Sequence, residues 1–225
     1  MKINNLHPWK VNPGRAKEIQ LFLRKQVILK NSFNRIEAVA GCDVAFNREE
    51  NKACAAICIY SFPKLRLIHS FFCASKLKFP YVPGLLTFRE APPLIKLLKK
   101  INRKIDLFLF DGQGIAHPLN MGLASHMGLI LGVPTIGCAK SRLYGEVRRL
   151  PANRRGATTN LYDDKGKVIG KILRTRKDAR PVFVSNGHKI SLDSSQKIVL
   201  TCCRGFRLPE PIRGAHILSR KGLKE

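Results

Sequence analysis

A short apolar run that ends in an aspartate and two glycines is the feature that most constrains this chain. Residues 107–110 are typical of a buried strand, and Asp111-Gly112-Gln113-Gly114 follows them directly. The pattern places a carboxylate at a strand end, where it can hold a divalent metal, and the glycines leave room for a substrate to come close. The alternative is a strand-to-helix turn that uses Asp and Gly only for backbone geometry.

Hydrophobic periodicity predicts the elements around this turn. The expected strands span 36–46, 53–60, 65–74, 106–110, 135–139 and 181–185, with a hairpin over 161–173, and the expected helices span 12–31, 87–101, 121–131, 191–203 and 209–220. A three-strand meander followed by alternating helices and strands predicts an α/β fold, with a mixed central sheet flanked by helices. The length of 225 residues predicts one domain over 1–225.

The charge of the chain indicates its partner. Lys and Arg total 41 against 15 Asp and Glu, a formal net charge of +26, and such an excess attracts polyanions, usually nucleic acid. The positive charge is spread along the chain, and the hydrophobic fraction of 44% suits a packed core, so a folded basic face is expected instead of a disordered basic arm.

The cysteines and the apolar runs bear on the compartment. The seven cysteines form no pair with zinc-like spacing, and their odd number argues against a disulfide framework, so we expect reduced thiols and a cytoplasmic protein. No signal segment and no membrane-spanning run is found in the sequence, and a membrane partner is not expected. A monomer is expected.

Three carboxylates are candidates for a metal site. Asp43 lies within the apolar run of the first expected strand, where an isolated charge is costly unless it is paired or bound to metal; it could also face solvent or meet a buried Arg. Glu90 lies near the start of a helix, a position that the helix dipole alone also favours. Asp43 and Asp111 on adjacent strands, with Glu90 above them, would form an acidic cluster that suits Mg²⁺, with Mn²⁺ as a substitute. A metal site beside a basic groove is typical of phosphodiester hydrolysis.

Other residues near the same sheet edge are candidates for the chemistry. Lys140 closes the strand 135–139 and can stabilise developing negative charge, although it is one of many basic residues. His117 follows the glycine turn and either contacts the phosphate or a metal-bound water, or bonds the backbone. The rigid loop Pro80-Tyr81-Val82-Pro83-Gly84 is suited to insertion between stacked bases; the alternative is that Tyr81 packs into the core.

Taken together, these segments resemble the endonuclease V family, the deoxyinosine 3′ endonucleases. The resemblance is carried, in chain order, by Gly41-Cys42-Asp43-Val44, Pro80–Gly84 leading into Phe88-Arg89-Glu90, Asp111–Pro118, Gly122–His126, Gly132–Gly137, Ala139-Lys140, Cys202–Gly205 and Leu208–Pro211. Gln113 stands where many members of the family carry His, and the insert Arg148–Arg155 is unusually basic.

The resemblance implies a ribonuclease H-like fold and assigns roles to residues. It implies Asp43, Glu90 and Asp111 as the catalytic acids and metal ligands, Lys140 and His117 as further active-site residues, and His216 as a late metal ligand. It makes Pro80–Pro83 the strand-separating wedge. It also implies recognition of hypoxanthine and cleavage of the second phosphodiester bond on its 3′ side, in DNA repair. Gly84 and Gly112 would then give the base close backbone approach.

Three alternatives remain open at this point. Another ribonuclease H-like nuclease would need the acids but no wedge. A non-catalytic nucleic-acid binder would need the basic face but no cluster of acids. Inosine in RNA could be the main substrate instead of inosine in DNA, since contacts to a 2′-hydroxyl cannot be read from sequence.

Overall fold

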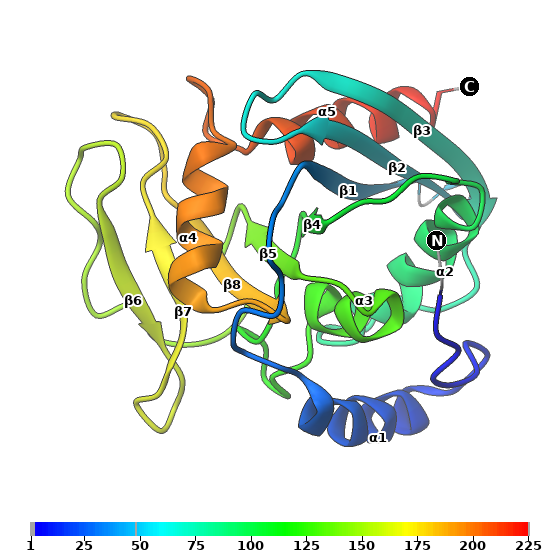
Figure 1. The fold of residues 1–225 in the computed structure, drawn as a ribbon. Coiled ribbons are helices and arrows are strands. Elements are labelled where there is room, and N and C mark those ends of the chain that lie inside the picture. Colours follow the sequence, from blue (N-terminus) through cyan, green and yellow to red (C-terminus); the bar gives the residue numbers. More distant parts are fainter. Residues whose placement is uncertain (1–2, 48, 225) are drawn as a thin grey trace.

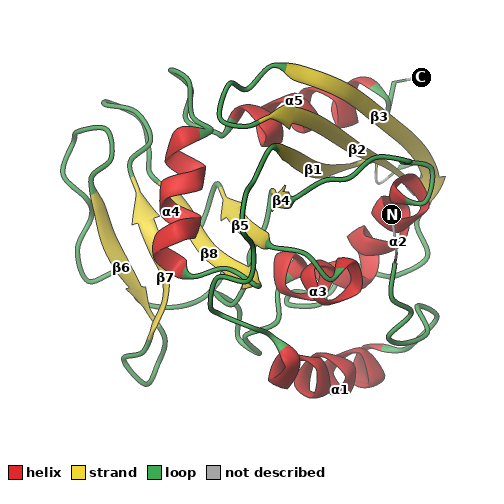
Figure 2. Ribbon diagram, viewed as in Figure 1, coloured by secondary structure: helices red, strands yellow, loops and turns green. Residues whose placement is uncertain are grey.

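The computed structural model describes residues 3–47 and 49–224, and it centres on one eight-stranded sheet (Figures 1 and 2). The strand order is β3-β2-β1-β4-β5-β8-β7-β6. The strands are β1 (Ala38–Asn47), β2 (Lys52–Ser61), β3 (Leu67–Lys76), β4 (Leu107–Phe110), β5 (Thr135–Ala139), β6 (Thr158–Tyr162), β7 (Val168–Leu173) and β8 (Val182–His188). Since β1, β4 and β5 run parallel and the outer strands pair antiparallel, the predicted mixed sheet is confirmed.

Helices cover both faces of the sheet (Figure 1). The helices are α1 (Pro13–Leu23), α2 (Leu86–Leu98), α3 (Leu123–Leu131), α4 (Leu192–Thr201) and α5 (Glu210–Lys221), with a 3₁₀ turn η1 (Arg24–Gln26) after α1. Helices α2 and α3 pack with the side chains of Ala40, Cys42 and Phe108 on one face, and α4 and α5 pack with Val39 and Leu109 on the other. Alternate residues of one strand therefore enter different cores, as the pleat requires.

Helix α1 forms an outer layer over α2 and α3. Its buried residues Ala16, Ile19 and Leu23 contact Phe88 of α2 and Leu129 of α3. It begins as predicted, with the side chain of Asn12 accepting from the amide of Arg15 and a proline at the first helical position.

Two details of the predicted helices are wrong. The first helix ends well before residue 31, because the chain leaves it to bond the end of β8: the Ile28 amide donates to His188 Nδ1, and the Lys189 amide donates to the Ile28 carbonyl. The sequence also predicts that Pro92 and Pro93 lie in the first turns of the helix 87–101, where missing amide donors cost least; in α2 they lie past the first four amides, so they remove two hydrogen bonds from the helix.

The structure also bears on the expectations about cysteines and membranes. All seven cysteines are free thiols, and every one except Cys73 is buried. Among residues 3–47 and 49–224, no helix combines the length and the apolarity needed to cross a bilayer.

Candidate metal centre and base pocket

Asp43 and Asp111 are brought together by the pairing of β1 with β4. Cys42 pairs with Phe110, the last residue of β4, and the Asp111 amide donates to the Cys42 carbonyl at 3.1 Å. Asp43 is the next residue of β1, so the two carboxylates lie side by side where β4 ends. This is the adjacency that the sequence predicted.

Gly41 lets helix α5 pack directly against β1. A Cβ atom at Gly41 would lie 2.0 Å from the backbone of Pro211, so no other residue fits there without moving the helix. The close approach places two side chains of α5 beside Asp43. The Ser219 hydroxyl donates to Asp43 Oδ2 at 2.5 Å, and His216 Nδ1 lies 3.4 Å from the same oxygen.

Ser219 was not among the predicted site residues. It is fully buried, and the carbonyl oxygen of His216, 3.1 Å from its hydroxyl oxygen, is a second, more distant acceptor for the same proton. The signal that could have found it is spacing: Ser219 follows His216 by three residues on a helix, so both face the same strand.

Lys140 completes the charged part of the site. Its ammonium lies 2.6 Å from Asp111 Oδ2 and 3.3 Å from His216 Nδ1. The guanidinium of Arg207 donates to the Lys140 carbonyl, and it also donates to the carbonyls of Pro181 and Arg180. Arg207, which the sequence did not indicate, thus fixes the backbone from which Lys140 reaches the acids.

Glu90 approaches the two aspartates from α2. It is buried, and burial raises its pKa well above the usual range, with the charges of Asp43 and Asp111 adding to the rise and Arg89 opposing it. Burial also raises the pKa of Asp111, while the hydrogen bond and charge of Lys140 oppose that rise and Asp43 adds to it. The three carboxylates therefore repel one another in a region from which water is largely excluded.

The donor set suits a divalent cation. Asp43, Asp111 and His216 each offer a ligand atom, and these atoms all lie within 4.8 Å of one another. Two carboxylates with a third nearby can offset the charge of such an ion, and the ion in turn offsets their repulsion. The structure thus brings together three of the four residues predicted as ligands, and Glu90 lines the same cleft beside them.

A cavity of about 320 Å³ adjoins the acids. The loop 81–84 lines it together with residues 111–113 and 139–143, so Asp111 and Lys140 face the cavity, as does Glu90 of α2. Tyr81 is 63% exposed, so the interpretation that it packs into the core is wrong. Gly84 has a positive φ of 79°, which favours glycine at the end of the loop.

Gly112 has no packing reason to be glycine. A Cβ atom there would meet Leu123 at 3.7 Å, an ordinary contact, and its φ is not in the left-handed region. Its neighbour Gln113 donates through Nε2 to the carbonyl of Ser141 and so ties the glycine turn to the segment 139–143.

His117 lines the cavity, but its ring is held by the backbone. Nε2 lies 2.8 Å from the Gly84 carbonyl, and Nδ1 accepts from the Leu119 amide at 3.1 Å. With Nδ1 as acceptor, Nε2 carries the proton and donates to Gly84. Burial lowers the pKa of His117, which keeps the ring neutral. Of the two interpretations, this geometry supports the backbone-bonding one, in which His117 anchors the end of the loop; contact with a phosphate stays a prediction.

Comparison with known proteins decides the family. The sequence profile described as Endonuclease V matches residues 22–217. An endonuclease V of Methanothrix thermoacetophila is 48% identical over 221 residues, which cover 98% of this chain and 96% of that protein. This chain belongs to the endonuclease V family. It is therefore a nuclease, an enzyme that hydrolyses phosphodiester bonds, as the resemblance implied.

Solved structures of endonuclease V agree with the fold and its ribonuclease H-like sheet. The crystal structure of the Bacillus subtilis protein has a TM-score of 0.92 at 32% identity and covers 100% of this chain and 98% of its own. The endonuclease V of Ciona intestinalis, crystallised with a 24mer DNA containing an inosine followed by a ribo-adenosine, has a TM-score of 0.81 at 29% identity. That match covers 94% of this chain and 97% of the Ciona chain.

Proposed function

We propose that this protein recognises hypoxanthine in DNA and hydrolyses the second phosphodiester bond on its 3′ side, in a reaction that depends on Mg²⁺ or Mn²⁺ and serves DNA repair. The observation that carries the proposal is that Asp111 belongs both to the group of metal-ligand atoms and, with Glu90, to the lining of a cavity that also includes an exposed, proline-stiffened loop. The Ciona relative bound to inosine-containing DNA supports the choice of base.

Asp43, Asp111 and His216 would hold the cation, with Glu90 close enough to complete the site. A bound divalent cation supplies Lewis-acid chemistry to the scissile phosphate. Ser219 fixes one oxygen of Asp43, which leaves the other free to bind. The ammonium of Lys140 adds positive charge beside Asp111, where it can stabilise the negative charge that develops on the phosphate.

The cavity is suited to a base that has left its stack. Its volume of about 320 Å³ accepts a flipped purine, and the absence of a side chain at Gly112 allows the base to lie against the backbone. Hypoxanthine is guanine without the 2-amino group, so a close wall at that edge would exclude guanine. Tyr81, exposed at the tip of the loop, would fill the space that the base vacates.

A nicking assay tests this function. End-labelled duplexes that differ only in inosine or adenosine are incubated with Mg²⁺, Mn²⁺ or EDTA, and the product length maps the cut. We expect metal-dependent cleavage of the inosine duplex alone. Equal cleavage of adenosine would favour another ribonuclease H-like nuclease, and binding without cleavage would favour a non-catalytic binder. Matched RNA strands in the same assay compare inosine in RNA with inosine in DNA.

The wedge is tested in the same assay with Tyr81→Ala. Because only a duplex has to be opened, we expect about tenfold slower cleavage of inosine in a duplex, with much less effect on a single strand, since unstacking costs a few kcal/mol. Equal losses on both substrates would show that Tyr81 stacks on the base instead of separating strands.

A further inference from the structure

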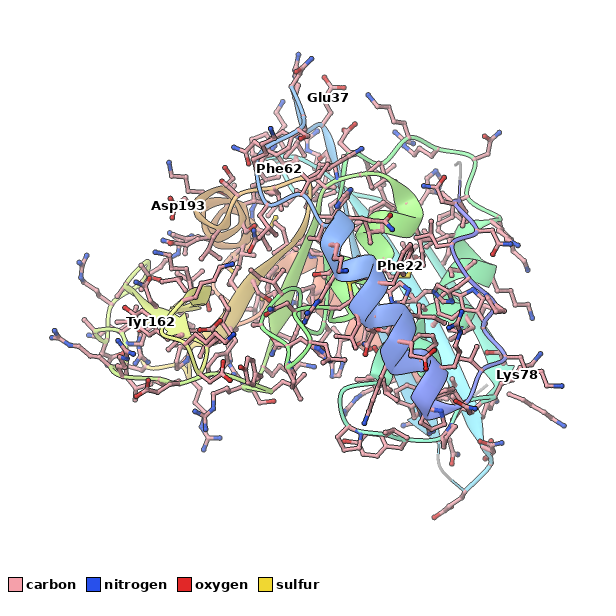
Figure 3. All side chains as sticks on the ribbon, turned by 90° about the horizontal axis from the view of Figure 1, so that it is seen from below. Phe22, Glu37, Phe62, Lys78, Tyr162 and Asp193 are labelled. Carbon is pink, nitrogen blue, oxygen red and sulfur yellow. The ribbon has the colours of Figure 1, made fainter. Side chains whose placement is uncertain are left out.

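A second groove lies at the base of the wedge loop, outside the site described above. Its volume is about 800 Å³, and three separate segments line it: residues 9–11, residues 75–79 at and after the end of β3, and residues 88–96 of α2. Every charged residue that lines it is basic, namely Lys10, Lys76, Lys78, Arg89 and Lys96. The four lysines are exposed, and Figure 3 labels Lys78 at the edge of the molecule.

The floor of the groove is aromatic and rigid. Phe79 and Phe88 are buried beneath it with ring centroids 5.6 Å apart, and Trp9 is half-buried with its ring 5.8 Å from Phe88. Pro92 and Pro93 add apolar surface from α2. Of these aromatic rings only that of Trp9 is exposed enough to meet a base, and the lysine ammonium groups around it can meet phosphates, a combination typical of surfaces that bind nucleic acid.

Arg89 connects this groove to the acids. Its guanidinium donates to the Phe79 carbonyl at 3.0 Å, at the stem of the wedge loop, and it lies 4.9 Å from the ring centroid of Phe46. Phe46 lines the cleft that contains Asp43 and Glu90. The groove therefore begins at Arg89, one residue before Glu90. The wedge loop touches both sites: residues 81–84 line the base cavity, and Phe79, just before the loop, lines the groove.

We propose that this groove holds the strand opposite the inosine after the wedge has separated the duplex. The inference rests on the proposed function, in which Tyr81 enters the duplex and one strand remains with the acids. The other strand then needs a path on the far side of the loop. The groove offers that path, with five positive charges and no negative charge among the residues that line it.

The test removes three of the lysines together, as Lys76→Gln, Lys78→Gln and Lys96→Gln. The matched control removes three exposed basic residues that do not line the groove, as Lys64→Gln and Arg66→Gln between β2 and β3 and Arg103→Gln before β4. Affinity for inosine-containing duplex and single strand is measured in EDTA over a range of salt. For the groove variant we expect about tenfold weaker duplex binding and a slope of log affinity against log salt that is shallower by about 2, since each single-strand phosphate contributes about 0.7. Single-strand binding should stay within twofold of the wild type.

The sequence supplies its own probe of the groove, because Trp9 is the only tryptophan. Saturating duplex should change the fluorescence of Trp9 in the wild type and the control, and should change it much less in the groove variant. Three results would each overturn the proposal. The groove variant could lose no more duplex affinity than the control variant, it could lose equal affinity for duplex and single strand, or Trp9 fluorescence in the wild type could stay unchanged at saturating duplex. The failure of the proposed function is distinct: the wild type would then cut inosine and adenosine duplexes alike, whatever the groove variant does.

Discussion

Two polar clusters pack against helix α2, and burial affects the protonation of their side chains differently. The histidine cluster is His7 and His126, packed among the rings of Trp9 and Phe88. The acid cluster is Asp43, Glu90 and Asp111. Helix α2 contributes Phe88 to the first and Glu90 to the second, only two residues apart.

Burial drives both clusters towards their neutral forms, but only the first can become neutral without a conflict. His7 Nε2 and His126 Nε2 lie 2.7 Å apart and share one proton, and burial lowers the pKa of His126 to about 3. The acid cluster has three carboxylates, raised pKa values at Glu90 and Asp111, and one close ammonium. Burial alone therefore does not mark a functional site in this molecule. The acid cluster is distinguished by repulsion among its carboxylates, which a bound cation can relieve.

The largest effect is expected from Asp43→Asn. The variant keeps an oxygen that can accept from Ser219 but loses the charge that a cation needs, so metal-dependent cleavage should fall by about 1,000-fold or more. Unfolding of the metal-free variant should need no less denaturant than that of the wild type, because one repulsive charge is gone. Cleavage within tenfold of the wild type would remove Asp43 from the metal centre.

The histidine cluster should make the protein less stable in acid. His126 titrates near 6.5 in the unfolded chain and at about 3 in the folded protein, so the unfolded chain binds the extra proton as pH falls below 6.5. At pH 5 this lowers the free energy of unfolding by about 2 kcal/mol relative to pH 7. His126→Gln cannot titrate, so denaturant unfolding at the two pH values should differ less than in the wild type. A difference as large as the wild type's would mean that other groups cause the loss.

These clusters also show what a sequence can reveal. Asp43 and Asp111 were found because each breaks an apolar strand pattern, and Lys140 because it closes the next strand of the same sheet. Ser219 and Arg207 were missed, since a serine in a helix and an arginine in a loop are unremarkable until the fold brings them to Asp43 and Lys140. His126 was noticed only as part of a family motif, because its partner His7 is 119 residues away in the sequence.

The same reasoning explains the errors in the predicted fold. The sequence located the sheet because a short apolar run is a local property, whereas the end of the first helix depends on contacts with β8 that periodicity does not contain. His117 was placed near the chemistry by its position after the glycine turn, but its orientation depends on the carbonyl of Gly84, which belongs to another loop.

Ser219→Ala sharpens the comparison by removing a polar partner from the acid cluster without changing its charge. Asp43 would lose the donor that fixes one of its oxygens, so we expect about tenfold weaker binding of Mn²⁺, the low end for loss of a group that orients a metal ligand. Calorimetric titration of the metal measures this without turnover. The matched control is Ser195→Ala, another fully buried helical serine, which should leave the metal affinity unchanged.

The smallest effect on the free energy of unfolding is expected from Glu90→Gln in metal-free protein. Its pH dependence should be opposite to that expected for the histidine cluster. The folded-state pKa of Glu90 is raised, so as pH rises above the unfolded value the unfolded chain releases its proton first and the folded state becomes relatively less stable. Gln removes this penalty, and the free energy of unfolding at pH 8 should rise by about 1 kcal/mol, the usual gain when a functional residue is replaced for stability. Saturating Mg²⁺ should reverse the order, because the cation stabilises the wild-type carboxylates more than the variant. Glu90→Gln and His126→Gln should therefore change the pH dependence of the free energy of unfolding in opposite directions. If Glu90→Gln destabilised the metal-free protein at pH 8, the carboxylate would be a structural hydrogen-bonding group, and the contrast between the clusters would fail.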